Sequence, residues 1–160
     1  MTLYGEARGC HLLDCLAVMA VIRERYLRPG WWSRESGDSI PDDTWEAVVR
    51  DPWQFTSWHT HDAAHRRNHE AMLNAEKNDP AGWARMFHLA HYGIYHMTDD
   101  DVRQLFFAES PDDFPTHFIS RPLTAPPLSW GDDVRAVPVR YADSAFRFYI
   151  VPKGRPQRRR

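Results

Sequence analysis

The longest apolar run in the sequence predicts one buried helix near the N-terminus. Between residues 12 and 28, apolar side chains occupy more than one helical face, and a helix of this kind is buried in a protein core. Pro29 and Gly30 follow the run and predict its C-terminal end. A short helix over residues 2–8, ending at Gly9, is predicted before it. We expect the rest of the chain to pack around the longer of these two helices.

Four further helices are predicted by capping residues and by the spacing of apolar positions. Thr44 precedes a short helix over residues 45–50. The segment 62–78 predicts a polar helix. The inner face predicted for it consists of Ala64, Met72, Leu73 and Ala75. An aspartate followed by proline opens a helix over residues 80–97, and a threonine followed by three aspartates opens another over residues 99–107.

Beyond residue 107 the sequence changes from helical to irregular and extended patterns. Five prolines between residues 111 and 127 predict irregular structure. Residues 134–141 and 146–151 alternate in polarity or are β-branched, and the four residues between Tyr141 and Phe146 predict a hairpin loop. Residues 53–58 are predicted to be extended. The fold class that follows is α+β, mainly helical with a small β-hairpin or sheet near the C-terminus.

Positive charge is concentrated at the C-terminus. The net charge is −2, yet the last eight residues contain five basic side chains, so the rest of the chain carries −7. This balance argues against a nucleic-acid partner for the domain, which we expect to span residues 1–152. Residues 153–160 form a basic tail that is predicted to be disordered. Two interpretations of the tail stay open, namely attraction to an anionic cell envelope and an ordinary solvated terminus.

Membrane and disulfide signals are weak. No segment approaches the ~20 apolar residues that a transmembrane helix needs, and charged residues precede the apolar run where a signal peptide would begin. The two cysteines, Cys10 and Cys15, are too few for a disulfide scaffold. We expect both thiols to be free and partly buried, without a metal role.

Glu6 lies just before the predicted buried helix. A carboxyl group beside low-dielectric surroundings has a raised pKa, which a general acid working near neutral pH requires. Position alone does not separate this role from that of a solvated or helix-capping glutamate.

Four short motifs occur in order along the chain. They are Glu6-Ala-Arg-Gly9 with Ala17-Val-x-Ala-Val-Ile-x-x-Arg25, Val48-Val-x-x-x-x-Gln54-Phe-Thr-Ser-Trp58, Thr116-His-Phe118 and Arg147-Phe-Tyr149. In this order they resemble segments of the SleB-like cell-wall hydrolases, a family of spore-cortex-lytic enzymes and related phage lysins. The chain departs from the family pattern at Cys10, where the family has a second glutamate, and at Phe146, where it has histidine.

The resemblance implies a lysozyme-like fold and cleavage of the MurNAc–GlcNAc bond of peptidoglycan, with no cofactor. Most glycosidases use two carboxylates, and no second acid stands out in this sequence. The resemblance points to Glu6 as the single catalytic residue of a lytic transglycosylase or muramidase, with assistance from the substrate itself. The implied protein is a monomeric phage lysin that binds peptidoglycan strands and reaches the wall from the host cytoplasm or from a virion.

Substrate contacts are expected around this acid. Aromatic side chains in polar or proline-rich segments offer flat faces to sugars, and polar neighbours offer hydrogen bonds. The expected set is Trp31, Trp32, Gln54, Ser57, Trp58, Trp130, His117 and Tyr149, with His117 and Tyr149 included on the motif match alone. Each of these side chains also has an ordinary structural interpretation.

Two alternative functions stay open. His61, His65 and His69 share one helical stripe, and a histidine pair at i, i+4 suits zinc, so the first alternative is a zinc-dependent peptidoglycan amidase. No glutamate stands between the histidines as it does in the HExxH motif. The second alternative is a non-catalytic peptidoglycan-binding protein of a virion or wall, because Cys10 and Phe146 replace the usual family residues.

Overall fold

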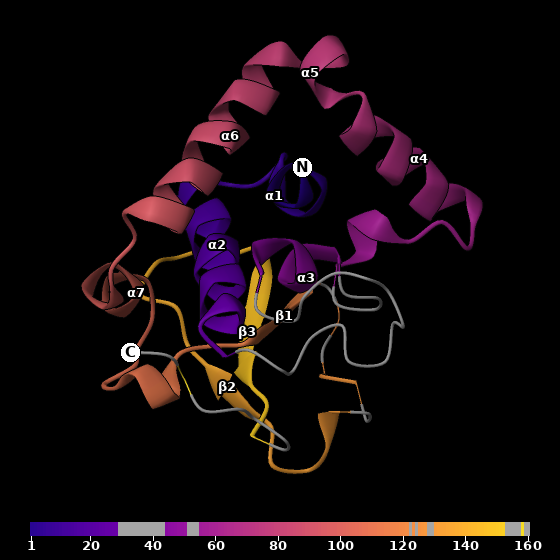
Figure 1. The fold of residues 1–160 in the computed structure, drawn as a ribbon. Helices are drawn as coiled ribbons and strands as arrows, with labels where there is room; N and C mark the ends of the chain where they lie inside the picture. The colour runs from indigo at the N-terminus through magenta and orange to yellow at the C-terminus, as the bar shows by residue number, and fades with distance from the viewer. Residues whose placement is uncertain are drawn as a thin grey trace.

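The computed structural model describes residues 1–28, 44–50, 55–121, 123, 125–127, 130–152 and 158. Helices and a small antiparallel sheet occupy different parts of the molecule (Figure 1). The helices are α1 Thr2–Ala7, α2 Leu12–Tyr26, α3 Trp45–Arg50, α4 Ala63–Leu73, α5 Ala75–Asn78, α6 Pro80–Tyr95 and α7 Asp99–Leu105, with 3₁₀ helices η1 Thr56–Trp58 and η2 Pro111–Asp113. The strands are β1 His117–Ser120, β2 Arg135–Val137 and β3 Phe146–Ile150. The predicted α+β class is confirmed.

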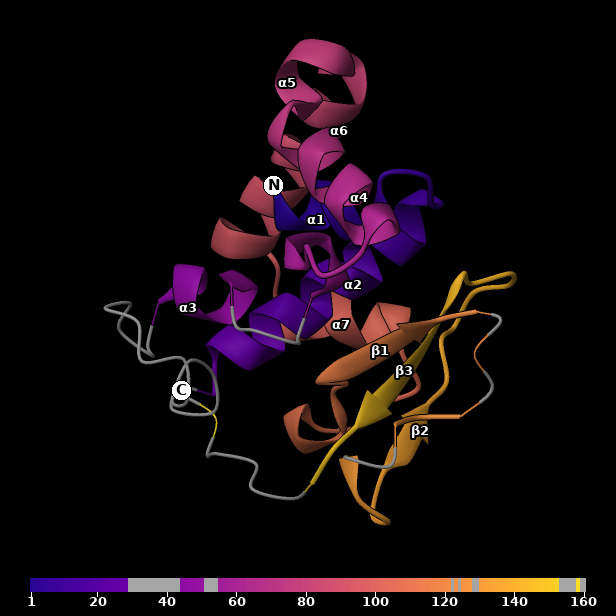
Figure 2. The same cartoon turned by 90° about the vertical axis from the view of Figure 1, so that its right-hand side faces the viewer.

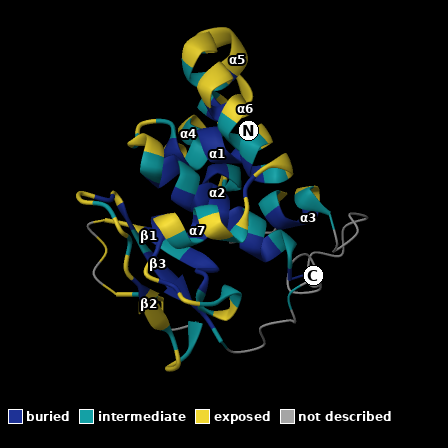
Figure 3. Ribbon diagram, turned by 90° about the vertical axis from the view of Figure 1, so that its left-hand side faces the viewer, coloured by how far each residue is buried: buried dark blue, intermediate teal, exposed yellow. Residues whose placement is uncertain are grey.

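Helix α2 is the central element. It contacts α1, α3, α6, α7 and β1, and most of its length is buried (Figure 3). From Ala17 to Ile22 no side chain is more than 2% exposed, which confirms the buried helix predicted from the apolar run. The helix ends at Tyr26 rather than at residue 28. The N–H group of Leu27 closes the last turn by bonding to carbonyl groups of that turn.

The other helices surround α2 and α1. In Figure 1, α4, α5 and α6 form an angled frame around α1, and α1 contacts both α4 and α6. The view turned by 90° places the sheet below these helices (Figure 2). None of the helices in the described ranges has both the length and the hydropathy of a transmembrane span.

The sheet has the order β1-β3-β2, with both pairs antiparallel. The predicted hairpin of β2 and β3 is confirmed, but β2 is short because Pro138 follows it and has no N–H group to donate. Strand β1 was not predicted, since it is a four-residue segment among prolines. It pairs His117 with Tyr149 at one end and Ser120 with Phe146 at the other.

Two further helical predictions need correction. The helix predicted over residues 62–78 is interrupted at Asn74, whose side-chain amide donates to the Glu70 carbonyl oxygen at the end of α4. Of the four residues predicted for the inner face, Ala64 and Leu73 are exposed, whereas Met72 and Ala75 are buried. Residues 56–58 form the 3₁₀ helix η1 rather than an extended segment.

Asp14 joins α2 to the connection between β2 and β3. Its buried carboxylate accepts hydrogen bonds from the Tyr141 hydroxyl at 3.0 Å, the Ser144 hydroxyl at 2.6 Å and the Ala145 N–H group at 3.1 Å. A buried carboxylate with three donors is satisfied where it lies. Asp14 is therefore a structural residue of the helix–sheet junction.

We expect Asp14→Asn to lower the free energy of unfolding by about 1–2 kcal/mol, because the amide nitrogen removes one acceptor from a hydrogen-bonded, buried group. Urea unfolding followed by circular dichroism measures the change. Asp143→Asn is the matched control, since Asp143 is exposed in the same loop and asparagine tolerates its positive φ of 57°. Equal stability of the two variants would contradict the role assigned to Asp14.

Arg158, in the basic tail, lies against the helices. Its guanidinium donates to Glu24 Oε2 at 2.9 Å and to Asp99 Oδ2 at 3.0 Å. Glu24 is buried and also accepts from Arg28 at 2.8 Å. Arg158 thus contacts α2 and the start of α7. The other tail residues lie outside the described part of the chain.

Candidate functional site

One face of α1 lies against η1 and carries Glu6. Thr2 and Glu6 are one helical turn apart and so point to the same side of α1. Thr2 Oγ1 accepts a hydrogen bond from the Trp58 indole N–H at 2.8 Å, and Glu6 Oε1 accepts one from the Ser57 N–H at 2.7 Å. The Thr56 hydroxyl lies 3.3–3.4 Å from both carboxylate oxygens of Glu6. The two elements, fifty residues apart in sequence, therefore form one site.

Gly5 permits this close approach. A Cβ atom at Gly5 would lie 2.3 Å from the Ser57 Cβ atom, a distance that real side chains do not reach. Gly9, at the other end of the same segment, has no atom within 4 Å of such a Cβ position. Glycine is thus required at position 5 by packing, whereas no contact requires it at position 9.

The environment of Glu6 raises the pKa of its carboxyl group. Burial is the largest cause, since it disfavours the ionised form. Hydrogen bonds from Ser57 and Thr56 and the positive charge of Arg25 act in the opposite direction without cancelling it. The protonated form of Glu6 therefore persists to higher pH than in an ordinary glutamate. This is the direction that the sequence analysis expected.

Helix α4 packs against η1. The His69 Nδ1–H group donates to the Ser57 carbonyl oxygen at 3.0 Å, and the His69 ring packs against Trp58 with centroids 5.7 Å apart. Asn68 accepts from Arg8 at 2.7 Å. His69 thereby holds Ser57, whose N–H group bonds to Glu6, and Asn68 joins α4 to the end of α1.

His117 and Tyr149 lie together on paired strands, with Trp130 against both. The Trp130 ring centroid is 4.7 Å from that of His117 and 5.7 Å from that of Tyr149. Arg25 lies between this aromatic group and Glu6. Its Nε–H group donates to the carbonyl oxygen of Thr116, the residue before His117, at 2.6 Å, and its positive charge lowers the pKa of Glu6. Three of the predicted substrate residues are therefore neighbours.

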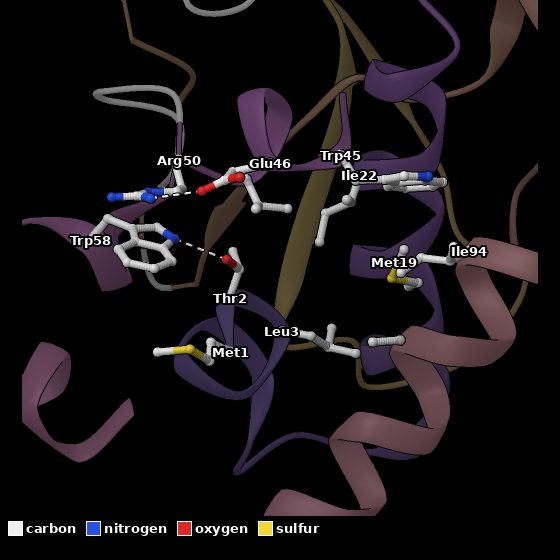
Figure 4. Close-up of a pocket in the computed structure, with 12 residues that line it drawn as sticks. Met1, Thr2, Leu3, Met19, Ile22, Trp45, Glu46, Arg50, Trp58 and Ile94 are labelled. Carbon is white, nitrogen blue, oxygen red and sulfur yellow. Dashed lines mark hydrogen bonds and ion pairs between the residues drawn. The ribbon is translucent and has the colours of Figure 1, made fainter. Parts of the chain in front are cut away.

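Trp58 borders a separate cavity between α1, α2, α3 and α6 (Figure 4). The cavity has a volume of about 410 Å³ and a mostly apolar lining that includes Trp45, Met19 and Ile94. Glu6 is not among its lining residues. The Trp58 indole thus donates its N–H group to Thr2 of α1 and also lines this cavity.

The histidine stripe is divided between two places. His61 and His65 lie together with Asp62, and their nearest ligand atoms are within 4.8 Å of one another. His69 is instead engaged with Ser57. The spacing i, i+4, i+8 therefore does not bring all three imidazoles to one metal position.

The thiols of Cys10 and Cys15 are both free. Burial raises the pKa of Cys15 to about 11, and its thiol donates to the Ala7 carbonyl oxygen at 3.3 Å. Cys15 is therefore an unreactive packing residue between α1 and α2.

Sequence reasoning missed part of the site and named residues outside the described ranges. Trp31, Trp32 and Gln54 lie outside these ranges. The residues that it missed are Thr2, Gly5, Arg25 and Thr56. Arg25 and Thr56 stand inside the quoted motifs, which was an available signal, whereas Thr2 and Gly5 had none. Comparisons with protein-family models, curated proteins and solved structures found no match to this chain.

Proposed function

We propose that this chain is a peptidoglycan glycosidase that cleaves the MurNAc–GlcNAc bond with Glu6 as its proton donor. The observation that supports the proposal is the setting of Glu6. Its carboxyl group is held at 2.7 Å by the Ser57 N–H group, and burial raises its pKa. A carboxyl group with a raised pKa in a fixed orientation suits general acid catalysis.

One carboxyl group suffices for the proposed reaction. Glu6 gives its proton to the glycosidic oxygen, and the bond from that oxygen to the muramyl C1 breaks with its electron pair on the oxygen. The carboxylate of Glu6 then takes a proton from the group that attacks C1. If that group is water the product has a reducing end, and if it is the muramyl 6-hydroxyl the product is a 1,6-anhydro sugar. Asp14 is unsuited to a second catalytic role, because Tyr141 and Ser144 occupy its carboxylate.

The aromatic side chains supply surfaces for the glycan in this proposal. Trp130 and Trp58 are half-buried and can present part of a ring to the glycan, whereas His117 and Tyr149 are buried and pack against Trp130. Trp58 lies next to Ser57, which holds Glu6. Sugar rings stack on flat aromatic faces through their apolar C–H sides.

Mass spectrometry of digested peptidoglycan tests the reaction class. Muropeptides with anhydro-muramyl ends support a lytic transglycosylase, and those with reducing muramyl ends support a muramidase. Freed stem peptides with intact glycan strands would overturn the proposal in favour of an amidase. Absence of any product, with the protein bound to the sacculi, would overturn it in favour of a non-catalytic binding protein.

The pH dependence of muropeptide release gives a further prediction. A general acid must be protonated, so the rate is expected to fall as pH rises through the pKa of Glu6. The Thr56 hydroxyl lowers that pKa, so Thr56→Val is expected to move the alkaline limb of the profile to higher pH. Thr60→Val, a change at an exposed threonine of the same loop, should leave the limb in place. A shift of the limb to lower pH in Thr56→Val would contradict the role of Glu6.

A further inference from the structure

Three metal-ligating side chains converge directly after η1. His65 Nδ1 lies 2.7 Å and His61 Nε2 lies 3.3 Å from the same oxygen, Oδ2 of Asp62. The ring centroids of His61 and His65 are only 4.2 Å apart. A nitrogen atom of each of these two neighbouring imidazoles thus lies within 3.3 Å of one carboxylate oxygen.

The backbone of α4 prepares this arrangement. Asp62 is the N-cap residue, and its Oδ1 atom accepts from the N–H groups of Ala64 at 2.8 Å and His65 at 2.9 Å. These bonds orient the carboxylate and leave Oδ2 facing the imidazoles.

The donor set decides which cation fits. Imidazole nitrogens suit zinc and other first-row transition metals, whereas calcium and magnesium prefer oxygen ligands. The His59 ring is a neighbour, with its centroid 5.6 Å from that of His61 and 5.7 Å from that of His65, but the ligand atoms that lie within 4.8 Å of one another belong to His61, Asp62 and His65. Two imidazoles and one carboxylate supply three protein ligands, to which water adds the fourth of a tetrahedral zinc site.

We infer that His61, Asp62 and His65 bind a zinc-type divalent transition-metal ion, with water completing the coordination. The ion fastens the loop between η1 and α4. Ser57, which holds Glu6, is only four residues before His61, so the metal stabilises the segment that positions the proposed proton donor. This role differs from that of a catalytic amidase zinc, and the inference stands independently of what Glu6 does.

Isothermal titration of the untagged, chelator-treated full chain with zinc chloride tests the inference. We expect one zinc ion per chain, a raised midpoint of thermal unfolding, and no comparable effect of magnesium or calcium. His61→Ala and His65→Ala are each expected to weaken zinc binding by more than about tenfold. His61 is exposed, so His61→Ala is expected to keep the fold. This variant still tests zinc binding if His65→Ala fails to fold.

His91→Ala is the matched control, because His91 is an exposed histidine whose ring also neighbours another imidazole, that of His96 at 5.6 Å. It should bind zinc as the wild type does. Visible absorption of the cobalt-loaded protein reports the ligands directly, and its tetrahedral bands should be lost in His61→Ala and kept in His91→Ala. Failure of the wild type to bind zinc, or equal binding by His61→Ala, would overturn the inference.

Discussion

Glu6→Gln is expected to lower peptidoglycan cleavage by roughly 10²- to 10⁴-fold, the range that a general acid contributes. The glutamine side chain keeps an oxygen that accepts the Ser57 N–H group, so the contact between α1 and η1 survives. It has no acidic proton to give to the glycosidic oxygen. Turbidity clearing of isolated cell walls measures the rate, and circular dichroism verifies the fold.

Glu6→Gln should also change how the free energy of unfolding depends on pH. The raised pKa of Glu6 means that the folded state favours the protonated carboxyl group. The stability that this group contributes is fully present below its ordinary pKa of 4.5 and is lost as pH rises through the raised pKa. Relative to the wild type, Glu6→Gln should therefore gain stability as pH rises across that window.

Glu76→Gln is the control for both signatures, since Glu76 is exposed on α5. It should match the wild type in clearing rate and in the pH dependence of unfolding. Near-normal clearing by Glu6→Gln would contradict the catalytic assignment. A stability difference that does not change with pH would contradict the raised pKa of Glu6.

Gly5→Ala has the second large expected effect. Its Cβ atom would meet the Ser57 Cβ atom at 2.3 Å and the Met72 sulfur at 3.1 Å. Overpacking of this kind costs about 1–3 kcal/mol, which exceeds the gain of about 0.5–1 kcal/mol from alanine in a helix. Since η1 must move away from α1, Glu6 loses its orientation, and a displacement of about 1 Å lowers the rate about 10²-fold.

Gly9→Ala makes the same chemical change where nothing lies within 4 Å, so its stability should stay within about 0.5 kcal/mol of the wild type. Urea unfolding and wall clearing are measured on both variants. Equal behaviour of the two would contradict the close packing of α1 on η1.

The elements that sequence predicted well are those whose cause is local. Helix α2 is apolar on more than one face, so its burial follows from its own composition. Asp79 caps α6 through the Gly82 N–H group, and Thr98 forms a capping box with Asp101 at the start of α7. Each of these signals lies within a few residues of the helix that it defines.

The elements that sequence missed depend on distant partners. Strand β1 exists because β3, about thirty residues later, pairs with it. The 3₁₀ helix η1 is held by Glu6 of α1 and by His69 of α4, which lie far from it or after it in the sequence. The break at Asn74 is an exception, because its cause is local: the Asn74 side-chain amide donates to the carbonyl oxygen of Glu70, four residues earlier, and a polar helix pattern does not reveal this.

The residues of the candidate site likewise differ in whether their signal in the sequence is local or distant. Glu6 was named from its place before the buried helix and from a resemblance, but its partners Thr56 and Ser57 are fifty residues away. No periodicity predicts which segment a short helix meets. The histidines show the opposite error. Their spacing grouped His69 with His61, whereas in the fold His69 donates a hydrogen bond to the Ser57 carbonyl oxygen.

The titration of Glu6 itself, followed by carbon-13 NMR of its carboxyl group alongside the pH profile of muropeptide release, tests the central claim most directly. We expect Glu6 to titrate above its ordinary value of 4.5 and the alkaline limb of the activity to coincide with that titration. A Glu6 carboxyl group that titrates at or below its ordinary value, with an activity profile that ignores it, would contradict the account.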